Sequence, residues 1–159
     1  MKTLTHEDGH RRVRLTTNEK ELLLTLLPQY PKLPNHHPNG SDDSDANPLL
    51  KEALADLRNK NRATTQAFLA DTSRFQPDGK DWILTLTDTD LEWLLQVLND
   101  LRVGSWHALG SPQQDEDGSY INFDHLTDEN IGDLWTMEIC GALQYELLNE
   151  LHGENPNER

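Results

Sequence analysis

Residues 91–109, LEWLLQVLNDLRVGSWHAL, decide the expected fold because they form the clearest helical pattern in the chain. On a wheel of about 100° per residue, one broad arc collects the residues Leu91, Leu94, Leu95, Leu98, Leu101, Ser105 and Leu109. Arg102 falls near the centre of this arc, Asn99 lies at its margin, and Asp100 points to the opposite face. The pattern predicts a core helix that carries a guanidinium group on its buried side.

The last predicted helix, from Asp128 to about His152, has a matching charge in its apolar face. Glu138 lies within an apolar arc formed by Ile131, Leu134, Trp135, Gly141, Ala142 and Tyr145. A buried charge that loses its partner costs about 3–5 kcal/mol. We therefore predict that Arg102 and Glu138 form an ion pair between the two helices, where Gly141 and Ala142 allow a close approach.

Asn61 adds a third polar side chain, on the apolar face of a helix predicted from Pro48 to about Asp71. Together with Arg102, Glu138 and the marginal Asn99, it would form a polar layer, which is stable only when every member is hydrogen-bonded. One interpretation is that this layer sets the register of the helices. Another is that it forms the floor of a binding or catalytic pocket for a small anion, with Arg102 as anchor. A third is that the helical wheels place the wrong residues on the buried faces, so that no polar layer exists.

A second apolar stripe runs along the other side of the last helix, through Cys140, Leu143, Leu147 and Leu151. A helix that is apolar on two sides is central in its own fold or shared with another molecule. The leucines of this stripe are therefore candidates for the core, or for an interface with a second copy or another protein. Cys140 is the only cysteine, so it forms no internal disulfide, and the absence of a reactive partner nearby in sequence predicts an inert thiol.

The remaining patterns predict a mainly α protein, a four-helix bundle-like single domain over residues 1–159. A further helix is expected at 17–27, in addition to those described above. The alternating segments 11–16 and 82–87 predict a short two-stranded β ribbon beside the helices.

Three segments are expected to lack regular structure. Pro, Gly, Asn, Ser and Asp dominate residues 31–46 or so, which predicts a flexible loop. Residues from about 111 to 127 form an acidic loop, and about 154–159 a disordered tail.

Charge is distributed unevenly over the chain. The net charge is −14, and residues 111–159 carry twelve Asp and Glu against a single Arg. Nucleic-acid binding depends on Lys and Arg, so we expect no nucleic-acid partner. An acidic surface keeps a protein soluble or attracts a basic partner. The chain also lacks the apolar run of roughly 18 residues that a membrane span needs, which predicts a cytoplasmic protein without membrane contact.

No motif for catalysis, a cofactor or a metal stands out. Asp115, Asp117 and Asp124 occupy positions of a calcium-binding loop, but Gln113 replaces its first ligand, which favours a solvated acidic turn. None of the histidines has the helical spacing of a zinc site. We therefore expect no catalytic residue, metal or cofactor, and an enzyme is the less favoured class.

The segment 93–102, WLLQVLNDLR, resembles the bacterial domain-of-unknown-function family numbered twenty-seventeen. That family shows a similar helix with a Trp, an apolar Leu and then Leu-Asn-Asp-Leu-Arg, here Trp93, Leu94 and residues 98–102. The similarity spans most of residues 12–151, while the acidic loops depart from it. The resemblance implies a mostly helical protein of unknown activity. Genes of this family often lie near that of the ClpS adaptor of the Clp protease, which raises the hypothesis of a regulatory or adaptor role in protein turnover.

The sequence as a whole favours a nonenzymatic protein–protein interaction or regulatory module. The contact would use the last helix or the acidic C-terminal third, and the partner would be another protein or a second copy of the chain. The alternative is the small anionic-ligand or catalytic pocket over Arg102.

Overall fold

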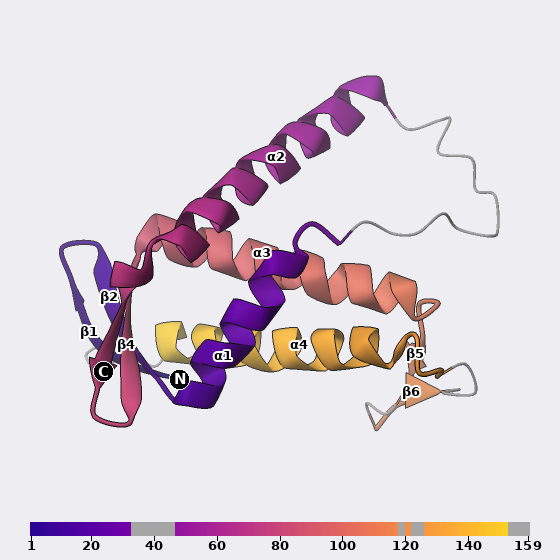
Figure 1. Ribbon diagram of the computed structural model, residues 1–159. Coiled ribbons are helices and arrows are strands. Elements are labelled where there is room, and N and C mark those ends of the chain that lie inside the picture. Colours follow the sequence, from indigo (N-terminus) through magenta and orange to yellow (C-terminus); the bar gives the residue numbers. More distant parts are fainter. Residues whose placement is uncertain (33–46, 118–119, 122–125, 153–159) are drawn as a thin grey trace, which may run out of the picture.

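The computed structural model describes residues 1–32, 47–117, 120–121 and 126–152 (Figure 1). Most of the predicted flexible loop, part of the predicted acidic loop and the whole predicted tail lie outside these residues. The described part of the chain combines one four-stranded sheet with four α-helices.

The fold is mixed α/β, so the prediction of a mainly helical bundle with a short ribbon is wrong. All strands of the sheet are antiparallel, and their order is β1 (Lys2–Glu7), β2 (His10–Leu15), β4 (Asp81–Thr87), β3 (Phe75–Asp78). The two segments expected to form the ribbon do pair, with Val13 opposite Leu84, but they are the central strands of a larger sheet.

Tight turns explain the two outer strands. Asp8 and Gly9 connect β1 to β2 with φ angles of 51° and 72°, and positive values at both positions are typical of a type I′ hairpin turn. Between β3 and β4, Gly79 has a φ of 64° at the first position of another two-residue turn. Such turns match the twist of antiparallel strands, so each outer strand folds back on its neighbour.

Local capping groups fix where the helices begin. The four helices are α1 (Thr17–Leu26), α2 (Pro48–Ala70), α3 (Asp88–Ala108) and α4 (Ile131–His152). Thr16 and Glu19 form a capping box at α1, and Thr87 and Asp90 form one at α3. Asn47 caps α2, and Pro48 occupies its first turn, where the sequence predicted the helix to begin. Within the described residues, none of the helices has the length and apolar content needed to cross a membrane.

Short elements complete the connections. The 3₁₀ turn η1 (Leu27–Gln29) follows α1, and η3 (Thr72–Arg74) joins α2 to β3. After α3, the segment β5 (Gln113–Gln114) pairs with β6 (Tyr120–Ile121).

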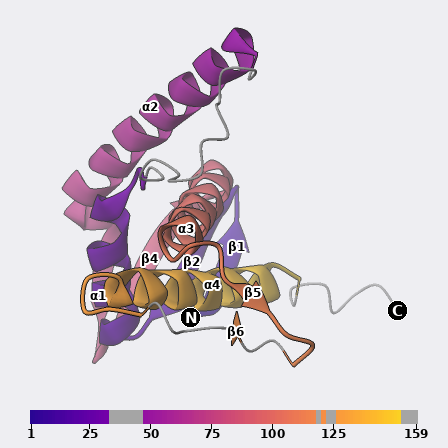
Figure 2. The same cartoon turned by 90° about the vertical axis from the view of Figure 1, so that its right-hand side faces the viewer.

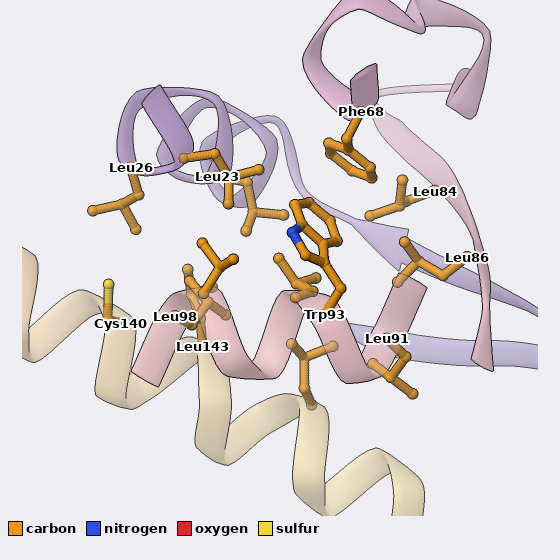
Figure 3. Close-up of a cluster of buried hydrophobic side chains, with 14 of the residues drawn as sticks. Leu23, Leu26, Phe68, Leu84, Leu86, Leu91, Trp93, Leu98, Cys140 and Leu143 are labelled. Atoms are coloured by element: carbon orange, nitrogen blue, oxygen red, sulfur yellow. The ribbon is translucent and has the colours of Figure 1, made fainter. Parts of the chain in front are cut away.

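The hydrophobic core surrounds α3 (Figure 3). The buried residues of this helix are Leu91, Trp93, Leu94, Val97, Leu98, Leu101, Gly104 and Ser105. Leucines of α1 and β4 and the Cys140–Leu143 turn of α4 point toward it. Phe68 of α2 packs against Trp93, with ring centroids 5.0 Å apart and ring planes tilted by 43°. The buried face of α3 is therefore covered by the sheet and by the three other helices together.

Helix α2 packs on this core through its C-terminal half only. Asn61, Thr65 and Phe68 are buried, whereas every residue from 48 to 60 is exposed. Both views show this first half of α2 extending away from the body of the protein (Figures 1 and 2). We call residues 48–60 the α2 arm.

The capping box of α3 makes a testable contribution to stability. Burial opposes ionisation of Asp90, but hydrogen bonds from the Thr87 amide at 2.9 Å and from Arg74 Nη1 at 2.6 Å hold its pKa below the ordinary 3.8. Replacing Asp90 by Asn should lower the free energy of unfolding at pH 7 by about 1–2 kcal/mol, as measured by denaturant titration.

The pH dependence of stability follows from the same shift. A lowered carboxyl pKa stabilises the folded state above the unfolded pKa, and this stabilisation is lost as pH falls through the folded pKa. When the pH is lowered from about 5 to 3, the melting temperature of the wild type should therefore fall by more than that of Asp90→Asn. Glu92→Gln, an exposed change on the same helix, should behave like wild type. Equal acid sensitivity of wild type and Asp90→Asn would contradict this role.

Candidate protein-binding surfaces

The structure does not bring the predicted polar layer together. Arg102 and Glu138 both belong to the described part of the chain, where both are exposed and no ion pair joins them. Instead, Arg102 Nη2 donates a hydrogen bond to Asn99 Oδ1 on its own helix, at 3.0 Å. Asn61 is buried elsewhere, with its amide 3.5 Å from Gln96 Oε1. The predicted layer is thus a surface pair on α3 and a separate buried amide on α2.

Packing shifts the buried face of α3 relative to the predicted arc. The arc omitted Trp93, Val97 and Gly104, all of which are buried. Phe68 of α2 packs against Trp93, and Lys32 lies against Gly104. Arg102 consequently lies at the edge of the core, and its stem crosses α4 at Gly141, where an added Cβ would be 3.6 Å from Arg102 Cδ. The guanidinium group reaches the surface, as long basic side chains do when their stems are covered.

The second apolar stripe of α4 faces the core. Cys140, Leu143 and Leu147 are buried in the core, and Leu151 packs against it. These leucines, which were candidates for an interface, thus pack within the chain. Their aliphatic side chains suit a core because burying them leaves no polar atom without a partner.

The opposite stripe of α4 is solvent-exposed although the sequence placed it in the core. Its largest side chains are Trp135, with 62% of its surface exposed, Tyr145, with 67%, and Ile131, with 45%. Glu138 and Ala142 lie between them and are also exposed. We call these five residues the outward face of α4. The helix presents them rigidly, because its other side is anchored in the core.

Cys140 is a buried thiol without signs of reactivity. Burial raises its pKa to about 12, and the nearby charges of Lys32 and Arg102 offset only part of this effect. Because the thiolate is the nucleophilic form, the thiol should be inert at neutral pH.

A thiol titration tests this inference. At pH 8 the folded protein should not react with a chromogenic disulfide reagent over minutes, whereas the protein in denaturant should release one equivalent. Fast reaction of the folded protein, at a rate close to that of a free thiol, would show that Cys140 is accessible and ionisable.

A shallow depression of about 560 Å³ lies beside Arg102, between the end of α3 and the first half of α4. Arg102 is the only charged residue among the described residues that line it, with Trp106, Gln113 and Met137 among the others. In the part of the chain that the structure describes, no three His, Cys, Asp or Glu residues are grouped as metal ligands. This depression offers one exposed cation to an anion and little enclosure.

A second cleft, of about 270 Å³, separates the α2 arm from the C-terminal half of α3. We call it the α2–α3 cleft. Leu54, Leu57 and Arg58 line one wall. The opposite wall belongs to α3 and is lined by Asp100, Val103, Gly104 and His107. The floor is formed by residues 30–32.

The floor of the cleft is held by close contacts with α3. Tyr30 Oη lies 3.4 Å from Asp100 Oδ2, to which it donates a hydrogen bond. Desolvation raises the pKa of Asp100, while this hydrogen bond and the charge of Arg58 partly offset the effect. Lys32 forms an ion pair with Asp133 of α4. The floor segment thus connects α3 to α4.

Gly104 permits the closest of these approaches. A Cβ at this position would lie 2.7 Å from the backbone oxygen of Lys32, well inside contact distance. Helix α3 therefore requires glycine here so that residues 30–32 can lie against it.

Matched glycine substitutions test this requirement. Gly104→Ala should lower the free energy of unfolding by about 1–3 kcal/mol, because backbone must move to remove the overlap. Gly132→Ala in α4, where a Cβ meets no atom within 4 Å, should instead raise it by about 0.5–1 kcal/mol. Denaturant titrations of both variants provide the measurement. Equal effects at the two positions would contradict the close approach at Gly104.

Comparison with known proteins identifies no relative: no family model, curated protein or solved structure matches the chain. The resemblance to family twenty-seventeen stays a prediction. Of the residues that carry this resemblance, four belong to the core, namely Trp93, Leu94, Leu98 and Leu101. Their type is explained by packing around α3 and indicates no function.

The exposure of the α2 arm was not expected from the sequence. Leu50, Leu54 and Leu57 share a helical face with Asn61 and Phe68, and the sequence predicted this face as the apolar side of the helix. Two signals were present in the sequence. The predicted helix is long, and basic residues cluster beside its first leucines, at Lys51 and Arg58.

Proposed function

We propose that this protein is a nonenzymatic, cytoplasmic protein-binding module that binds its partner through the outward face of α4. The observation that carries this proposal is the exposure of Trp135 and Tyr145 on a helix whose other side is anchored in the core. Trp and Tyr dominate the binding energy of many protein interfaces. A contiguous apolar surface on a rigid element is also a common mark of protein contact.

The charge of this region indicates what the partner should provide. Glu138 lies within the outward face, and residues 111–159 are strongly acidic. A partner with apolar recesses for the aromatic rings and basic groups at its rim would complement this surface. The predicted resemblance to family twenty-seventeen supports a regulatory or adaptor role in protein turnover. This support is an association between neighbouring genes and supplies no mechanism.

The alternative of an anionic-ligand or catalytic pocket over Arg102 has weaker support. The guanidinium group already donates to Asn99, and the depression beside it is open to solvent. Ligand pockets usually enclose most of the ligand surface and converge several polar groups on it.

Alanine substitutions on the outward face test the proposed function. Trp135→Ala and Tyr145→Ala should change the free energy of unfolding by less than about 0.5 kcal/mol, because both side chains are mostly exposed. In affinity capture from native lysate, each variant should lose proteins that the wild type retains. Light scattering at several concentrations shows whether the bound partner is a second copy.

Leu49→Ala is the matched control, since Leu49 is an equally exposed apolar residue, with 72% of its surface exposed, on a different helix. It should capture the same proteins as the wild type. If the double variant Trp135→Ala/Tyr145→Ala captures and self-associates as the wild type does, the outward face of α4 is not the binding surface.

A further inference from the structure

We propose that the α2–α3 cleft is a separate binding site for an amphipathic helical segment whose apolar stripe is flanked by acidic residues. This site lies on the other side of α3 from α4 and does not depend on the proposed role of the outward face (Figures 1 and 2).

The apolar part of the argument is an uncovered leucine stripe. Leu50, Leu54 and Leu57 expose 55%, 44% and 45% of their surfaces, and their spacing of four and three residues places them on one side of α2. Further along the same side, Asn61 and Phe68 are buried. The stripe is thus covered by the chain itself in its second half and uncovered in its first half.

The shape of the site suits a helix. The α2 arm diverges from α3 (Figure 1). The cleft between them has a floor at residues 30–32 and a facing wall that includes Val103 and His107. Helix-binding grooves recognise apolar anchors at positions i, i+3 or i+4, and i+7. A third helix lying along the arm would present such anchors to Leu50, Leu54 and Leu57.

The basic charge of α2 favours a partner helix that carries acidic residues beside its apolar stripe. Residues 48–70 contain four Lys and Arg against two Asp and Glu, in a chain with a net charge of −14. Helical spacing places Lys51, Arg58 and Arg62 in a row along one flank of the leucine stripe, and Lys60 on the other flank. The acidic wall residue Asp100 already interacts with Arg58 and Tyr30. Carboxylates beside the partner's apolar stripe would complement the basic row.

The same charges disfavour a second copy as the occupant. Two α2 arms packed along their leucine stripes would bring Lys51 and Arg58 of each copy close to the basic row of the other. Like charges that face one another across an interface are destabilising. An acidic helix from another protein meets no such repulsion.

Selection from a displayed peptide library tests the proposal on the full chain. The library contains helices of about 18 residues with randomised apolar residues at i, i+3, i+4 and i+7. In half of its members these positions are flanked by Glu, and in the other half by Lys. Glu-flanked peptides should be enriched. For an enriched peptide, fluorescence anisotropy should show an affinity about tenfold weaker with Leu54→Asp and also weakened by Arg58→Glu.

Matched variants distinguish binding in the α2–α3 cleft from binding elsewhere on the surface. Leu49→Asp makes the same chemical change on the same helix, about 100° away from the stripe, and should leave affinity within about twofold of wild type. Trp135→Ala should also bind normally, because it tests the other surface. If Leu54→Asp fails to fold by circular dichroism, Leu50→Asp replaces it, at a more exposed position on the stripe.

Several results would overturn the proposal. These are no enrichment of Glu-flanked peptides, preference for Lys-flanked peptides, or binding that Leu54→Asp and Leu50→Asp leave unchanged. A wild-type dimer in light scattering that Leu54→Asp converts to monomer would assign the cleft to a second copy instead.

Discussion

Burial of one broad face of α3 by the sheet and by the other three helices is the constraint on which the rest of the structure depends. Trp93 meets Phe68 of α2, Leu98 lies near the Cys140–Leu143 turn of α4, and leucines of the sheet and of α1 approach from other directions (Figure 3). A helix whose buried face contacts several elements cannot be shifted without opening several contacts at once, since cores are packed as densely as organic crystals. The exposed surfaces of α2 and α4 are positioned by where each helix touches α3.

Local sequence predicted the helices better than the sheet. Helix starts depend on a few adjacent residues, so Asn47 and Pro48 marked the beginning of α2 correctly. The outer strands β1 and β3 lack an alternating apolar pattern, because edge strands bury little on either face. The Asp-Gly sequences at residues 8–9 and 78–79 were the available signals for two hairpins, and β1 and β3 were not predicted from them.

The candidate surfaces were harder to predict, because periodicity identifies apolar stripes without showing which of them is buried. Helix α4 has two such stripes, and contact with α3 selected the one with Cys140 and Leu143 for the core. The position of Arg102 depended in the same way on which side of α3 is covered, with Phe68 against Trp93 and Lys32 against Gly104. In α2, the leucine stripe extends beyond the part of the helix that the rest of the chain covers. Only the tertiary structure shows that this cover begins at Asn61.

The two proposed surfaces differ in charge and lie on different sides of one rigid helix. The outward face of α4 is aromatic and belongs to the acidic third of the chain, whereas the α2 arm is leucine-rich and basic. Because α2 and α4 both pack against α3, and residues 30–32 join the floor of the cleft to α4 through Lys32 and Asp133, neither surface needs to move when the other is occupied. Under the two proposals, partners of different charge would bind on opposite sides of α3, and the difference in charge would keep each partner from the other's site.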